Sequence, residues 1–161
     1  ARVTAIDAAQ RNIDIASLHA EQAGLNIDFR ATQPEDLARS GETFDIVVSL
    51  EVVEHVADLP AFLAACAALV RPGGGMVLST INRTVKSLAL AKVLAEYVLR
   101  WLPVGTHDWK KFVKPSELAS GIRPTGMEIT ALRGMHYDPF ADTWRLGNDL
   151  DVNYLAFAKK D

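Results

Sequence analysis

The stretch FDIVVSL at residues 44–50 constrains the fold more than any other part of the sequence. It is apolar without the alternation that a strand with one face in water would show. Such a run predicts a central strand that is buried on both faces. Segments typical of strands and helices alternate on either side of it, so we predict an α/β sandwich around a mostly parallel sheet.

The flanking elements are expected from their capping and turn residues. Gly24 is typical of a left-handed helix cap, Pro34 of a first helical turn and Asp58 of an N-cap. We expect strands at 2–7, 26–32 and 76–81, and helices at 8–24, from Pro34 and from Asp58 through Val70. RPGGG at 71–75 predicts a turn, with Gly73 and Gly74 as turn residues. After a helix at 114–122, strands at 126–134 and 151–160 should form an antiparallel hairpin with a long connection.

Composition limits the classes of function. With 161 residues and 49% hydrophobic content, the chain fits one domain, residues 1–161, interrupted by an inserted amphipathic helical segment at about 82–112. A net charge of −3 argues against a nucleic-acid partner. Cys66 is the single cysteine, which fits a reducing compartment and a buried thiol. Because Ala1 opens a strand-like run, we expect the first strand of the fold to lie upstream.

Asp7 ends the strand expected at 2–7. In open α/β sheets, ligands bind at the carboxyl ends of the strands, and an acid there can accept hydrogen bonds from both hydroxyls of an adenosine ribose. The alternative is a helix cap or a solvated turn acid. Leu50 and Glu51 end the strand at 44–50 and are expected at the same edge.

SLEVVEHVADLP at 49–60 places Glu51, Glu54 and His55 within five positions. If this segment is helical, the spacing i, i+3, i+4 puts the three side chains on one face, where they could converge on one ion. The alternative is that the acids favour a helix start while His55 lines a cleft. His55 could also act as a general base, because its unperturbed pKa is about 6.5. His107 is the alternative base or a substrate contact, or else a loop histidine that caps a turn.

The order of these motifs resembles the class I S-adenosylmethionine-dependent methyltransferases. The motifs are VTAID, FDIVVSLEVVEHVAD and LVRPGGGMVLST. Four further stretches are similar to the ubiquinone biosynthesis O-methyltransferases: INRTVKS, AEYVLRWLPVGTHDWKKFVKP, GMHYDPFADTWRLG and DVNYLAFAKK. The resemblance runs from Arg2 to the end of the sequence. The first strand and the glycine-rich loop of the family have no counterpart in this sequence. It implies a Rossmann-like class I methyltransferase sandwich with a C-terminal antiparallel hairpin.

The resemblance also implies an activity and ligands. These are S-adenosylmethionine-dependent methylation of catechol-type hydroxyls on polyprenylated quinol precursors, and a divalent metal, Mg²⁺ above all, on Glu51, Glu54 and His55. Leu50 should touch the adenine or methionine portion of the cofactor, or else belong to the core. The adenine edge is expected near Thr32, Gln33 and Glu35. Trp101, Trp109 and Trp144 either pack or stack on the quinone ring.

The stretch from about Val85 to Leu102 predicts a helix with a broad apolar face and cations suited to anionic headgroups. We therefore expect a peripheral protein on the cytoplasmic side of an inner membrane, or on the matrix side in mitochondria, beside other ubiquinone-synthesis enzymes. The alternative is that the apolar face packs on the domain or on a second copy. Two other functions stay open: methylation of another small acceptor, and an inactive membrane-associated fragment.

Overall fold

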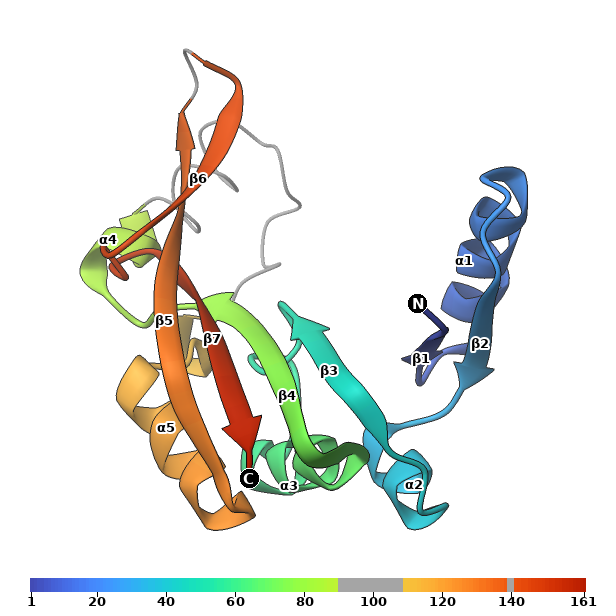
Figure 1. The fold of residues 1–161 in the computed structure, drawn as a ribbon. Helices are drawn as coiled ribbons and strands as arrows, with labels where there is room; N and C mark the ends of the chain where they lie inside the picture. The colour runs from blue at the N-terminus through green and yellow to red at the C-terminus, as the bar shows by residue number, and fades with distance from the viewer. Residues whose placement is uncertain (90–108, 139–140) are drawn as a thin grey trace. The chain divides into compact units, whose positions relative to one another are not determined.

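The structure is a computed structural model that describes residues 1–89, 109–138 and 141–161 (Figure 1). Contacts divide the chain into two compact units, unit 1 at Ala1–Glu42 and unit 2 at Thr43–Asp161. Unit 1 holds a two-stranded sheet and unit 2 a five-stranded sheet. Both are α/β, as the alternation in the sequence predicts.

Unit 1 is a strand–helix–strand–helix segment. Its elements are β1 (Val3–Asp7), α1 (Gln10–Gln22), β2 (Ile27–Ala31) and α2 (Pro34–Arg39). The two strands are parallel, with Val3 opposite Ile27 and Asp7 opposite Ala31. Gly24 has a φ of 66° and terminates α1, where Leu25 N donates to Ala20 O over 2.8 Å. This confirms the predicted glycine cap.

Unit 2 contains a mixed sheet in the strand order β3-β4-β7-β5-β6. Its strands and helices are β3 (Phe44–Leu50), α3 (Leu59–Leu69), β4 (Val70–Ile81), α4 (Val85–Ser87), α5 (Pro115–Ile122), β5 (Met127–Asp138), β6 (Thr143–Gly147) and β7 (Asn153–Lys160). Short 3₁₀ turns lie at Trp109–Lys111 and Arg123–Thr125. β3 and β4 are parallel, and the other three neighbouring pairs are antiparallel.

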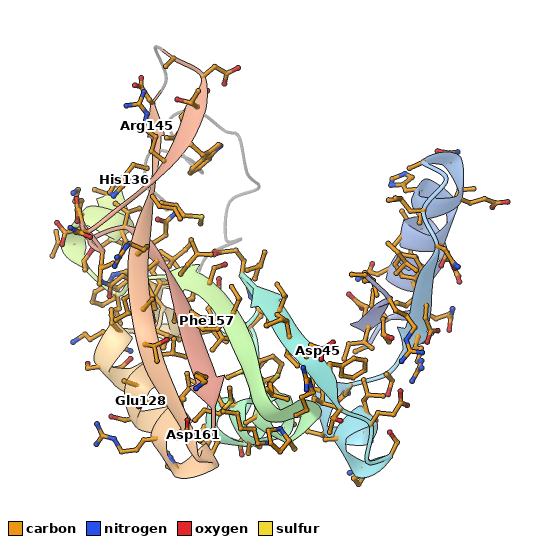
Figure 2. All side chains as sticks on the ribbon, in the orientation of Figure 1. Asp45, Glu128, His136, Arg145, Phe157 and Asp161 are labelled. Carbon is orange, nitrogen blue, oxygen red and sulfur yellow. The ribbon has the colours of Figure 1, made fainter. Side chains whose placement is uncertain are left out.

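The predicted pairing of the C-terminal strands is confirmed, because β5 and β7 are antiparallel neighbours. The sequence did not predict β6, which lies within their long connection. β6 pairs with the distal half of β5, with His136 opposite Arg145 and Tyr137 opposite Trp144. Figure 2 shows His136 and Arg145 on these two strands, away from Glu128 at the start of β5.

The expectation that residues 44–50 form a central strand buried on both faces is wrong for this sheet. β3 is one of the two edge strands of the five. Val47 packs against the core of unit 2, whereas Ile46, Val48 and Leu50 are about half exposed. Among the described residues of unit 2, the core lies against one face of β3. The apolar run alone does not show which face of a strand is covered.

The RPGGG turn interrupts β4 rather than preceding it. Val70 lies opposite Phe44 and Gly75 opposite Ile46, so residues 71–74 bulge out of the register. Gly73 has a φ of 74°, and a Cβ on Gly74 would stand 2.6 Å from the carbonyl oxygen of Asp45. Both positions therefore require glycine for backbone reasons, which confirms the predicted turn roles.

One continuous core supports the sheet of unit 2. Side chains from α3, α5, β4 and β7 form it, including Leu63, Leu78, Leu118 and Tyr154, each of which is fully buried. Cys66 is also buried in this cluster, as predicted. This core contacts β3 through Val47 and β4 through Leu78.

The predicted membrane helix is described only at its beginning. α4 starts it at Val85, where Thr84 and Ser87 form a capping box. Trp101, His107 and the rest of residues 90–108 lie outside the described residues. Within the described ranges, no helix is long and apolar enough to cross a membrane.

Candidate functional site

The carboxyl ends of β3 and β4 lie side by side in unit 2. The two strands are parallel, and Leu50 at the end of β3 stands opposite Ser79 near the end of β4. The chain then leaves β3 through a loop at residues 51–58, which leads into α3. In open α/β sheets this is the edge where ligands bind.

Glu51 is held in an unusual backbone conformation at the start of this loop. Its φ is 55°, in the left-handed region that non-glycine residues seldom adopt. Glu51 N lies 3.1 Å from both the carbonyl oxygen and the hydroxyl of Ser79. The Ser79 hydroxyl in turn donates to Glu51 Oε1 over 2.6 Å. One serine thus contacts both the backbone and the side chain of Glu51.

Glu54 is the buried acid of the loop. It is 4% exposed, and the hydroxyl of the fully buried Thr80 donates to its Oε2 over 2.9 Å. A carboxyl group in such surroundings is unfavourable without a hydrogen-bond donor. The Glu54–Thr80 contact therefore stabilises the path of the loop over the end of β4.

The helical arrangement considered for Glu51, Glu54 and His55 does not form. Residues 53–55 are a turn, closed by His55 N donating to Val52 O over 2.8 Å. α3 begins later, at Leu59, where Asp58 accepts from Ala61 N as the predicted N-cap. Among residues 1–89, 109–138 and 141–161, no three histidine, cysteine or acidic side chains could hold a metal ion.

Tyr154 of β7 lies beside the end of β4. It stands opposite Thr80, and its hydroxyl donates to Val113 O over 3.0 Å. Burial raises the pKa of Tyr154 above its ordinary value of 10.0, and the charges of Glu117, Glu54 and Glu51 raise it further. Tyr154 therefore remains a neutral donor at physiological pH.

Asp7 belongs to unit 1 and ends β1, as predicted. Its Oδ1 accepts from Ala9 N over 2.7 Å, and its Oδ2 accepts from Asn12 Nδ2 over 3.1 Å. These contacts correspond to the turn role that the sequence left open. A carboxylate can accept about four hydrogen bonds, so they leave room for two ribose hydroxyls.

The residues expected at the adenine edge follow β2 in unit 1. Thr32 N donates to Asp7 O over 3.0 Å, so Thr32 lies beside the end of β1. Gln33 occupies the N-cap position of α2 without making a side-chain cap bond, and Glu35 lies in the first turn of that helix. Unit 1 thus brings Thr32 near Asp7.

Two of the three tryptophans have defined surroundings. Trp109 donates from Nε1 to Thr84 O over 3.0 Å, which indicates a packing role. Trp144 is 66% exposed and contacts Tyr137, with ring centroids 5.2 Å apart.

Sequence reasoning missed Ser79 and Thr80. Their signal was a pair of hydroxyl residues inside the otherwise apolar strand MVLSTI. A polar pair at the end of a predicted buried strand indicates that hydrogen-bond partners lie nearby. The sequence did not indicate that those partners are the two glutamates.

Solved structures place the fold in a known class. Magnesium protoporphyrin IX methyltransferase from Synechocystis PCC 6803, with bound S-adenosylhomocysteine, matches 100% of this chain and 64% of its own, with a TM-score of 0.66 at 17% identity. N-methyltransferase NodS from Bradyrhizobium japonicum WM9, in complex with S-adenosylhomocysteine, matches 99% of this chain and 66% of its own, with a TM-score of 0.62 at 18% identity. The fold is that of a class I methyltransferase.

The sequence is more specific. Residues 1–132 match a family model described as a methyltransferase domain, and the chain belongs to this family. A protein of Parvibaculum lavamentivorans named ubiquinone biosynthesis O-methyltransferase is 51% identical over 160 residues, which are 99% of this chain. Those residues cover 63% of the Parvibaculum protein, so this chain spans less than two thirds of that relative's length.

Proposed function

We propose that this chain forms the greater part of an O-methyltransferase that uses S-adenosylmethionine. Its substrates would be catechol-type hydroxyls of polyprenylated ubiquinone precursors, 3-demethylubiquinol and the earlier polyprenyl benzenediol. The observation that carries the proposal is the 51% identity, over 99% of the chain, to a relative with that name. This identity extends along nearly the whole chain, so it includes more than the fold, which by itself does not imply a function.

Two described residues fit the cofactor. The carboxylate of Asp7 has acceptor sites beyond those used by Ala9 and Asn12, as ribose hydroxyls require. Leu50 is 51% exposed at the end of β3 and offers apolar surface to the adenine or methionine portion. When bound, S-adenosylmethionine supplies an electrophilic methyl group on a sulfonium. The protein then has to align the acceptor oxygen and exclude water.

His55 or His107 would take the proton of the acceptor hydroxyl. His55 lies on the turn next to Glu54 at the carboxyl end of β3, and His107 lies outside the described residues. Methyl-transfer rates of His55→Gln and His107→Gln across pH would separate them. The variant that lacks the base should lose the rise in kcat near the pKa of a histidine.

Mg²⁺ on Glu51, Glu54 and His55 stays a prediction of the resemblance. The described side chains do not gather into a three-ligand group, so we derive no step through a metal. Under the metal hypothesis, EDTA lowers turnover and added Mg²⁺ restores it, and Glu51→Ala and Glu54→Ala each lower activity while sparing cofactor binding. Unchanged turnover in EDTA would exclude a metal requirement.

The decisive experiment is a methyl-transfer assay with a short-tailed 3-demethylubiquinol and isotope-labelled S-adenosylmethionine, read by mass spectrometry. We expect one labelled methyl group on the quinol oxygen. Catechol without a tail and other small acceptors serve as competitors. Preference for another acceptor would favour the alternative of a different methyltransferase. Cofactor binding without any transfer would favour the inactive fragment.

We further infer that the segment around residues 82–112 attaches the protein to anionic membranes. The support is the apolar and cationic pattern of the sequence, since a polyprenylated substrate resides in the bilayer. Wild-type protein should sediment with vesicles that contain an anionic lipid, and less so at high salt. Trp101→Glu combined with Leu94→Glu should abolish sedimentation. Equal sedimentation of both proteins would exclude this role.

A further inference from the structure

Ser79 and Thr80 are neighbours in β4, yet they contact different glutamates of the loop 51–58. Successive residues of a strand point to opposite faces. Ser79 therefore reaches Glu51 on one face, and Thr80 reaches Glu54 on the other. One dipeptide fixes the loop on both sides of the sheet.

We propose that Ser79 and Thr80 are positioning residues for methyl transfer, which act by holding Glu51 and Glu54, and with them the loop 51–58, over the end of β4. The catalytic part of this inference rests on the proposed function. Each hydroxyl donates its hydrogen bond to a glutamate. The proposed role therefore requires no contact between either hydroxyl and a substrate.

The Ser79 contacts explain how Glu51 keeps its backbone conformation. A non-glycine residue with a φ of 55° is strained and persists only where its surroundings hold it. The Ser79 hydroxyl lies within hydrogen-bond distance of Glu51 N and also donates to Glu51 Oε1. Removing this hydroxyl takes away two of the contacts that hold the residue.

The Thr80 contact explains how Glu54 is tolerated inside the protein. Both residues are buried, at 4% exposure for Glu54 and none for Thr80. Within the described ranges, Thr80 is the side chain that donates to the Glu54 carboxyl group. Without this donor, the carboxyl group would be driven towards water and would carry the turn at 53–55 with it.

Ser49 provides a matched control on the adjacent strand. Its hydroxyl is buried, with 8% exposure of the residue, and has no hydrogen-bond partner among the described residues. Ser49→Ala therefore removes the same atom as Ser79→Ala at a similar depth, without breaking a hydrogen bond. Thr80→Ser keeps the hydroxyl of Thr80 and removes only a methyl group.

The test compares kcat and KM of Ser79→Ala, Thr80→Val, Thr80→Ser and Ser49→Ala in the methyl-transfer assay. Loss of a hydrogen bond to a charged group should lower kcat about tenfold or more in Ser79→Ala and Thr80→Val, while KM for S-adenosylmethionine changes less than about twofold. Thr80→Ser and Ser49→Ala should stay within about threefold of wild type. Melting temperatures show which variants fold.

Three results would overturn the proposal: equal kcat in Ser79→Ala and Ser49→Ala, wild-type kcat in Thr80→Val, or a Thr80→Ser rate as low as that of Thr80→Val. If Thr80→Val does not fold, the two serine variants decide. If wild type methylates no quinol, the proposed function fails, and amide hydrogen exchange of residues 51–55 decides the positioning instead. Faster exchange in Ser79→Ala than in Ser49→Ala supports it, and equal exchange refutes it.

Discussion

In unit 1, the carboxylate of Asp7 is held by groups two and five residues away along the chain, Ala9 N and Asn12 Nδ2. In unit 2, Glu51 and Glu54 are held by hydroxyls 28 and 26 residues away. The position of the Asp7 carboxylate therefore depends on a local turn. The positions of Glu51 and Glu54 depend on the pairing of β3 with β4.

The two units also differ in the burial of their apolar residues. Unit 1 has Ile13, Ala20 and Leu37 as buried apolar residues, and Leu18 and Leu25 are more than half exposed. Unit 2 has a continuous core under its sheet. Substitutions in the core of unit 2 should therefore lower stability more than substitutions at the exposed apolar positions of unit 1.

The largest effect should come from Leu63→Ala in α3. Leu63 is fully buried in the core of unit 2, and truncating it should lower the free energy of unfolding by about 2–5 kcal/mol. The matched change Leu18→Ala, at a residue of α1 that is 53% exposed, should cost about 0.5 kcal/mol or less. Urea unfolding followed by circular dichroism measures both. Equal losses would contradict the difference between the units.

Substitution of Asp7 distinguishes its cofactor role from its turn role. If Asp7 binds the ribose, Asp7→Ala should weaken S-adenosylmethionine by about 1–3 kcal/mol through lost charged hydrogen bonds. Asp7→Asn keeps an oxygen for Ala9 N but loses the charge, so it should also weaken binding. Calorimetry measures both affinities. Wild-type affinity in Asp7→Asn and Asp7→Ala would leave Asp7 with the turn role alone.

The helix starts of the two units give a smaller contrast. α3 has a side-chain N-cap from Asp58, whereas Ala9, the N-cap residue of α1, makes no side-chain cap bond. Asp58→Ala should lower the free energy of unfolding by about 1 kcal/mol, and Ala9→Ser should raise it by about 0.5–1 kcal/mol. Thermal unfolding measures both changes. A lower free energy of unfolding in Ala9→Ser would show that the chain before α1 cannot accept a capping geometry.

Two surface clusters should give the smallest effects, with different pH dependence. Arg30 of unit 1 pairs with Asp28 and Glu42, and Lys86 of unit 2 pairs with Asp149 and Asp151. The hydrogen bond from Arg30 lowers the pKa of Asp28, and that from Lys86 lowers the pKa of Asp149. Each cluster therefore contributes fully to the free energy of unfolding above the ordinary carboxyl pKa of 3.8. This contribution is lost as pH falls through the lowered pKa of its aspartate.

At alkaline pH the clusters should diverge. The hydrogen bond to Asp149 raises the pKa of Lys86, so its contribution is complete below the ordinary value of 10.5 and is lost as pH rises through the raised one. Arg30 keeps its charge throughout. NMR titration of the two side chains should show an alkaline transition for Lys86 but not for Arg30. A Lys86 transition at or below its ordinary pKa would contradict the pairing.

Much of the local structure was predictable because its causes lie close together in the sequence. Gly24, Pro34 and Asp58 mark helix ends through their own backbone preferences or side chains. The strand assigned to residues 44–50 was correct in extent and wrong in burial. β6 was missed because its five residues are too few for alternating apolar side chains to mark a strand within a long connection.

The sequence by itself determined the α/β class, the methyltransferase resemblance and the position of Asp7 and Glu51 at strand ends, because these follow from patterns within a few residues. Only the tertiary structure decided that Ser79 contacts Glu51 and Thr80 contacts Glu54. Those contacts depend on the register of β3 against β4, in which Leu50 lies opposite Ser79. A shift of that register by one residue would turn each hydroxyl to the other face, and no local property of either strand specifies it.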